Sequence, residues 1–129
     1  MFYTNLCQNP LLEISGLFKS FRKLYFVLQI LMIKFYKAMP EKMRYIIRVY
    51  GRVQGVGFRY SAVRVAQSHG IKGFVKNLPD GSVFIEAEGS EKQLNTFLVW
   101  CRKGPSHSYV ESVTFDSLPP FGHKEFRIE

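Results

Sequence analysis

The chain has 129 residues, of which 47% are apolar, and it carries a net charge of +8 at pH 7. This length indicates one domain with room for an appendage, and the apolar content allows a packed core without disulfide or metal staples. The charge predicts anionic partners, but it does not distinguish nucleic acid from membranes or phosphorylated metabolites.

Cysteine and histidine are too sparse for a disulfide framework or a metal site. Cys7 and Cys101 lie far apart, and Cys101 falls at the end of a helical pattern, where a small buried hydrophobe is the common role. His69, His107 and His123 lack metal-ligand spacing with each other or with cysteine. We therefore expect no metal site.

Residues 1–42 read as a basic and apolar N-terminal extension, with a boundary near Met39-Pro40-Glu41. Residues 1–40 hold five basic side chains and one acidic one. The apolar run 24–33 is too short to span a bilayer, which needs about 20 residues. Three interpretations stay open: a poorly ordered or non-native extension with Met39 or Met43 as the working start, an interfacial or partner helix beside acidic lipid, and a targeting segment.

The first elements after the boundary are a strand, a glycine-rich loop and a helix. Residues 44–50 are rich in β-branched and aromatic side chains, which predicts a strand. Residues 51–57 form the loop. Phe58, Ala62, Val65 and Ala66 then recur at helical spacing and predict one buried face of a helix over residues 58–69.

The remaining pattern predicts a hairpin, a second helix and two further strands. Residues 71–78 and 82–88 read as strands joined by the turn 78–81. Ser90 and Gln93 form a capping box for a helix with Leu94, Phe97, Leu98 and Cys101 on its buried face. Residues 109–115 and 125–129 complete the set. This order predicts an α+β, ferredoxin-like two-layer sandwich, with two helices on one face of a mostly antiparallel sheet.

The loop 51–57 and its neighbour Arg59 carry the strongest chemical signal. Gly51, Gly55 and Gly57 allow the backbone to turn its N–H groups toward a small anion, and the helix that follows adds a partial positive charge. Arg59 could hold two phosphate oxygens. The alternative is an ordinary turn beside a solvated arginine. The loop lacks the Lys-Ser/Thr of a nucleotide P-loop, and Tyr60 breaks the dinucleotide pattern.

Asn77 ends the second predicted strand. One interpretation is a turn residue that bonds to neighbouring backbone. The other is an amide that fixes the direction of a water molecule. The proposed topology returns this strand toward the glycine-rich loop, so Arg59 and Asn77 could face the same anion.

At these residues the chain resembles the acylphosphatase family over about residues 43–129. Gly51-Arg-Val-Gln-Gly-Val-Gly-Phe-Arg59 is similar to the family's phosphate loop. Gly73-Phe-Val-Lys-Asn77, continuing through Asp80-Gly81-Ser-Val83 to Gly89, is similar to its second signature. Residues 1–42 fall outside the resemblance.

The resemblance implies hydrolysis of an acyl phosphate to a carboxylate and inorganic phosphate, without metal or cofactor. It gives Arg59 and Asn77 as the catalytic residues, with Asn77 orienting the attacking water. The implied phosphate-binding residues are Val53, Gln54, Gly55, Val56, Gly57, Phe58 and Arg59.

Two rival functions are weighed beside this one. Basic ferredoxin-like sheets can bind RNA, but the RNA-binding signature fails after Lys72-Gly-Phe. A carbamoyl-phosphate-handling part of a larger maturation enzyme would need further domains, and the chain ends at Glu129. We therefore expect a cytoplasmic monomer that acts on a small acyl phosphate, does not bind nucleic acid and does not require a membrane, although residues 1–42 could touch one.

Overall fold

The computed structural model describes residues 2–38 and 41–129, which fall into two compact units, Met1–Met39 and Pro40–Glu129. The predicted boundary at Met39-Pro40 lies outside the described residues. The first unit consists of one helix, α1 (Phe2–Ala38), whose side chains are described from Lys19 onward. Among the helices of the described ranges, none is both long and apolar enough to cross a lipid bilayer.

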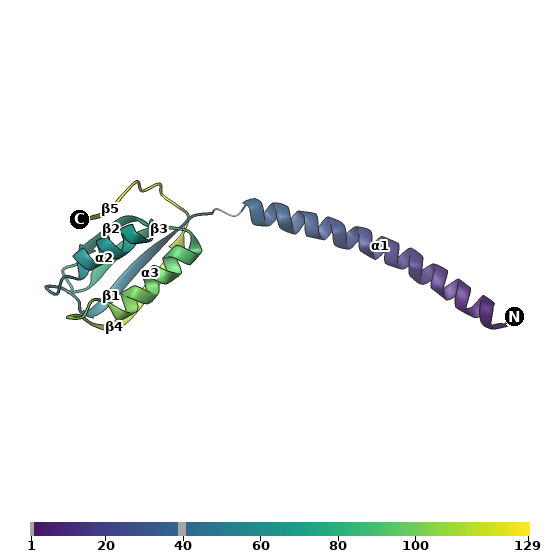
Figure 1. Ribbon diagram of the computed structural model, residues 1–129, viewed down its shortest axis with the longest axis horizontal. Coiled ribbons are helices and arrows are strands. Elements are labelled where there is room, and N and C mark those ends of the chain that lie inside the picture. Colours follow the sequence, from purple (N-terminus) through teal and green to yellow (C-terminus); the bar gives the residue numbers. More distant parts are fainter. Residues whose placement is uncertain (1, 39–40) are drawn as a thin grey trace. The chain divides into compact units, whose positions relative to one another are not determined.

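The second unit holds five strands and two helices. In chain order they are β1 (Met43–Arg52), α2 (Phe58–Ser68), β2 (Lys72–Asn77), β3 (Val83–Gly89), α3 (Glu91–Lys103), β4 (Tyr109–Leu118) and β5 (Phe126–Ile128). The sheet has the order β4-β1-β3-β2-β5, and only the β2–β5 pair is parallel. Both α2 and α3 contact the sheet (Figure 1).

The core lies between the sheet and the two helices. Alternate residues of the central strands are fully buried on one face, as Ile47 and Val49 of β1 and Ile85 of β3 illustrate. They pack against the buried side chains of α2 and α3, which include Phe58 and Phe97. The buried side chains that alternate along the strands and those that recur at helical spacing along α2 and α3 therefore pack together in one core layer.

The opposite face of the sheet is covered in part by residues 119–125. Glu88 on β3 is buried there, and its carboxylate accepts hydrogen bonds from the backbone amides of Phe121, Gly122 and His123. The His123 ring also lies 2.8 Å from a carboxylate oxygen of Glu86. These contacts fix a segment without regular secondary structure against the sheet.

The predicted fold class is confirmed. The Ser90–Gln93 capping box of α3 has both reciprocal hydrogen bonds, and the four residues predicted for its inner face are buried. The main differences lie at element ends. β4 continues to Leu118, beyond the predicted end at residue 115, because it stays paired with β1 as far as Arg44. Val65, predicted to be buried, is only partly covered.

Candidate active site

The loop between β1 and α2 presents backbone N–H groups without capping side chains. Gly55 and Gly57 have φ values of +73° and +77°, in the left-handed region that favours glycine. Gly57 is the N-cap of α2, no side chain caps this end, and the first turn of the helix contains no acidic residue. The first amides of α2 therefore remain available to a ligand, with the helix dipole favouring an anion.

Gly51 serves a different purpose from the one predicted for it. At φ +126° it sits where the pairing of β1 with β4 shifts register, between Tyr50 and Gly51. A Cβ at this position would collide with the carbonyl oxygen of Tyr109 and lie 2.8 Å from the backbone nitrogen of Glu111. Gly51 thus allows β4 to approach closely, while Gly55 and Gly57 shape the loop.

Arg59 and Asn77 line one small pocket of about 220 Å³. The remaining lining residues are Val53, Gly55, Gly57, Phe58 and Tyr60. Arg59 comes from the first turn of α2 and is half-buried, and Asn77 comes from the last position of β2. Arg59 is the only charged residue in this lining, which contains no Asp, Glu, Lys or His. Arg59 and Asn77, which the sequence predicts to face a common ligand, therefore line the same pocket.

The side-chain oxygen of Asn77 is buried and has no hydrogen-bond partner within residues 2–38 and 41–129. A buried carbonyl without a partner costs on the order of 1–3 kcal/mol, so such groups are normally completed by water or ligand. Asn77 is itself a lining residue of the pocket to which Arg59 and the uncapped amides belong. This arrangement suits a water molecule held beside a bound anion.

Gln54 has a role that the sequence did not indicate. Its side-chain amide nitrogen donates to the carbonyl oxygens of Leu78 and Ser82, at 2.8 and 2.9 Å. These two residues flank the turn that follows Asn77. Gln54 therefore ties the loop to the end of β2 and sets the spacing between the two halves of the pocket. Neither Gln54 nor Val56 lines the pocket, whereas the other five residues of the predicted phosphate-binding set do.

The turn between β2 and β3 is itself braced by Asp80. Its carboxylate accepts hydrogen bonds from the hydroxyl and the backbone amide of Ser82, and these bonds hold the pKa of Asp80 below its ordinary value. Because Ser82 also provides a carbonyl to Gln54, the Asp80 turn and the loop form one connected set of hydrogen bonds.

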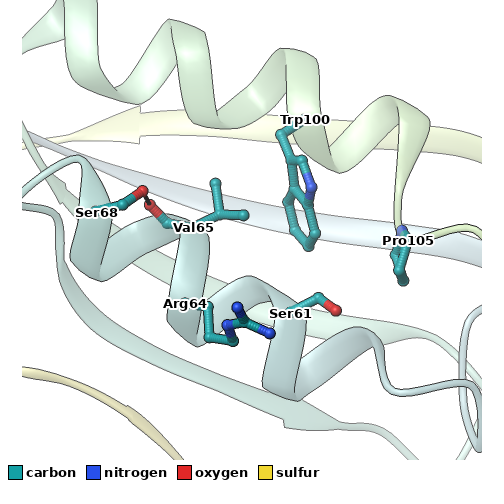
Figure 2. A pocket seen from close by; sticks show the side chains of 6 residues that line it. All are labelled: Ser61, Arg64, Val65, Ser68, Trp100 and Pro105. Carbon is teal, nitrogen blue, oxygen red and sulfur yellow. Dashed lines mark hydrogen bonds between the residues drawn. The ribbon is translucent and has the colours of Figure 1, made fainter.

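A second, larger pocket of about 410 Å³ lies between α2 and α3 (Figure 2). Its lining residues are Ser61, Arg64, Val65, Ser68, Trp100 and Pro105. The hydroxyl of Ser68 is already bonded to the carbonyl oxygen of Val65. This groove contains no glycine loop and no helix N-terminus, so its size does not make it the better anion site. Nowhere in the described part of the chain do three His, Cys, Asp or Glu side chains gather as a metal site would require.

The chain is similar to known proteins in sequence and in structure. A family model described as Acylphosphatase matches residues 45–128. An acylphosphatase of Thermotoga maritima is 52% identical over 83 residues, which cover 64% of this chain and 92% of the relative. The crystal structure of acylphosphatase from Bacillus subtilis has a TM-score of 0.66 and 40% identity, covering 67% of this chain and 98% of that one. Full-length HypF in a phosphate- and nucleotide-bound form has a TM-score of 0.63 and 30% identity, covering 70% of this chain and 12% of that one.

Proposed function

The chain belongs to the acylphosphatase family and hydrolyses acyl phosphates, and we propose that Arg59 and the β1–α2 loop hold the phosphoryl group while Asn77 orients the attacking water. The observation that carries this assignment is that Asn77 lines the same pocket as Arg59 and has a buried side-chain oxygen without a hydrogen-bond partner among the described residues. The orphaned acceptor and the cation meet the two needs of the reaction, a directed water and a neutralised phosphate.

Arg59 and the loop amides act on the charge of the phosphoryl group. The backbone N–H groups of residues 53–58 and the guanidinium of Arg59 surround its non-bridging oxygens and stabilise the charge on them in the transition state. The absence of a carboxylate among the pocket's lining residues supports this role, since a nearby negative charge would repel the substrate.

Asn77 acts on the water. Its side-chain oxygen accepts a hydrogen bond from the water, which directs a water lone pair at phosphorus. As the new oxygen–phosphorus bond forms, the bond from phosphorus to the acyl oxygen breaks and the carboxylate leaves. The water's proton passes to an oxygen of the phosphate, giving inorganic phosphate. A carboxylate is a good leaving group, so the pocket needs no general acid, and its lining residues offer neither an acidic side chain nor a histidine.

Alanine substitutions at the two residues should have different kinetic signatures. Arg59→Ala should lower kcat/KM for acetyl phosphate by on the order of 10²–10³ and weaken inhibition by inorganic phosphate. Asn77→Ala should lower kcat while leaving the inhibition constant for phosphate near that of the wild type, because only the water is misdirected. Release of phosphate measured in chelator tests both variants together with the metal-free mechanism.

Arg64→Ala is a matched control for Arg59→Ala. Arg64 lies on the same helix and carries the same charge, but it lines the groove of Figure 2 rather than the loop pocket. Its loss should leave kcat/KM within about twofold, as expected for a surface substitution. A folded Asn77→Ala protein with wild-type turnover would refute the water-orienting role, and activity abolished by chelator would refute the metal-free mechanism.

We also propose that the catalytic unit works as a monomer in the cytoplasm and has acyl phosphate as its only obligatory partner. The pocket supports this proposal because one chain supplies all the residues described for it. Cys101, buried as a free thiol, is compatible with a reducing compartment. Activity that coelutes with a monomer in size-exclusion chromatography is expected, and activity confined to a dimer peak would contradict the proposal.

A further inference from the structure

The helix α1 carries an apolar surface that the acylphosphatase reaction does not use. Twelve large hydrophobic side chains between Phe21 and Tyr36 are exposed on it. They are Phe21, Leu24, Tyr25, Phe26, Val27, Leu28, Ile30, Leu31, Met32, Ile33, Phe35 and Tyr36. A contiguous apolar surface of this kind marks an interaction site in a folded protein. From its pattern and charge, we propose that residues 19–38 dock on an anionic lipid surface.

One side of this helix is entirely apolar, and its lysines gather on another side. At 3.6 residues per turn, one arc of about 100° holds only apolar side chains. Its members are Phe21, Leu24, Leu28, Leu31, Met32 and Phe35. Lys19, Lys23, Lys34 and Lys37 fall within another arc of about 60°. A helix with these two sides can lie in the plane of a bilayer surface, with its apolar arc among the acyl chains.

The charge of the helix selects the kind of surface. Residues 19–38 contain four lysines and Arg22 but no acidic side chain. The long lysine side chains can follow the apolar surface and keep their ammonium groups at the headgroups. Tyr25 and Tyr36, which lie at the edge of the apolar arc, have the amphipathic rings that favour the membrane–water interface. Charge and aromatic placement therefore both match anionic lipid.

A second copy of the helix fits this surface less well than lipid does. Phe21, Leu24, Leu28, Leu31 and Phe35 are spaced as in a heptad repeat, so a coiled coil is the natural rival. A two-stranded coiled coil covers only that narrow stripe. It would not compensate the positive charge of residues 19–38, which contain no acidic side chain. A bilayer surface takes up the apolar arc and also supplies the opposite charge. Phe26, Ile30 and Ile33 lie on the lysine side of the helix, so they stay outside the covered arc in either arrangement.

Sedimentation of the full chain with vesicles tests the proposal. Vesicles of phosphatidylcholine with about one third phosphatidylserine should bind the protein, and pure phosphatidylcholine should bind it far less. Each lysine near such a surface contributes about fivefold to partitioning, so replacing Lys19, Lys23, Lys34 and Lys37 together by Gln should weaken binding on the order of 100-fold or more. Glutamine keeps the helix propensity. The double variant Leu28→Gln/Leu31→Gln should also lose binding, through its apolar arc.

A matched control separates docking by α1 from net charge. Replacing Lys72, Lys92, Lys103 and Lys124 by Gln removes the same charge from exposed positions of the catalytic unit. This control should keep vesicle binding, and all variants should keep wild-type hydrolysis of acetyl phosphate. Equal loss of binding in both lysine quadruple variants would overturn the proposal. The proposal would also be overturned if the wild-type chain bound no vesicles and instead formed a dimer without lipid that Leu28→Gln/Leu31→Gln dissociates. Binding of the chain to single-stranded RNA and not to vesicles would overturn it as well.

Discussion

Replacing Gln54 with alanine removes the side-chain amide that joins the loop before α2 to the turn after β2. That amide donates to two backbone carbonyl oxygens, of Leu78 and Ser82. Both carbonyls keep a second donor in the variant. The amide of Gly81 still bonds to Leu78 at 3.1 Å, and the amide of Leu78 still bonds to Ser82 at 2.9 Å. The substitution therefore removes two hydrogen bonds without leaving either carbonyl unsatisfied.

The expected loss of stability follows from that count. Two neutral hydrogen bonds at about 0.5–1.5 kcal/mol each, with no added penalty for an orphaned acceptor, give a loss of about 1–3 kcal/mol in the free energy of unfolding. For a unit of this size, the melting temperature should fall by roughly 4–24 °C. Urea denaturation followed by circular dichroism measures the first quantity, and a thermal melt measures the second.

The loss of activity should exceed what stability alone explains. Without the Gln54 amide, the loop and Asn77 are no longer held at a fixed separation, and small misplacements of reacting groups cost up to about 100-fold in rate. We expect kcat/KM for acetyl phosphate to fall about 10- to 100-fold at a temperature where the variant is fully folded. Added phosphate should restore part of the lost thermal stability, because it bridges the two halves of the pocket.

Gln67→Ala is the control for this experiment. Gln67 also lies on α2 and donates one longer hydrogen bond, 3.5 Å, to the carbonyl oxygen of Phe126. Its loss should cost less than about 0.5 kcal/mol and leave turnover unchanged. If Gln54→Ala behaved like Gln67→Ala in both assays, the idea that Gln54 positions the loop would be refuted.

Glu88 should make the free energy of unfolding depend on pH. Burial by itself raises the pKa of Glu88, but hydrogen bonds from the backbone amides of residues 121–123 outweigh burial and hold this pKa below its ordinary value. The stabilisation is therefore complete above the unfolded-state pKa and is lost as the pH falls through the folded-state pKa, so Glu88→Gln should cost about 2 kcal/mol near neutral pH and clearly less in acid. Urea denaturation of the wild type and of Glu88→Gln, at neutral and at acid pH, measures this loss of stability, and an equal loss at the two pH values would contradict the prediction. Gly51→Ala should destabilise by about 3 kcal/mol or more in the same assay, because its Cβ meets the Tyr109 carbonyl and its φ is +126°; a cost below about 1 kcal/mol would count against this account. Burial raises the pKa of the Cys101 thiol, so in a Cys7→Ser background a thiol reagent should label the protein only along its unfolding curve, and rapid labelling of the native state would contradict the burial.

The fold could be predicted because its determinants are local in the chain. The period of the apolar residues distinguishes strand from helix, and the capping box of Ser90 and Gln93 spans only three positions. The family, the fold class and the hydrolysis of acyl phosphates are all confirmed. The C-terminal end of β4 could not be predicted equally well, because it depends on the pairing of Leu118 with Arg44, more than seventy positions earlier.

The site could be predicted only where its residues lie in short signatures. Arg59 and Asn77 were indicated in this way, and their catalytic roles stay predictions until the variants are measured. The contribution of Gln54 depends on carbonyls more than twenty positions away, and that of Gly51 depends on Tyr109. Neither contact leaves a local pattern, so the sequence predicts for both residues only a general place in the phosphate loop.

The uncapped start of α2 has a consequence for how the enzyme responds to its own product. A capping side chain would stabilise a helix by about 1 kcal/mol, and Gly57 provides none. On the proposed assignment, the amides left open by Gly57 bind the phosphoryl group, so inorganic phosphate is a ligand of the folded state alone. Accumulating product would then occupy the pocket and raise the melting temperature according to one dissociation constant. Product inhibition and thermal protection would then both report the same binding equilibrium. At high phosphate concentration the enzyme would turn over more slowly and would unfold at a higher temperature.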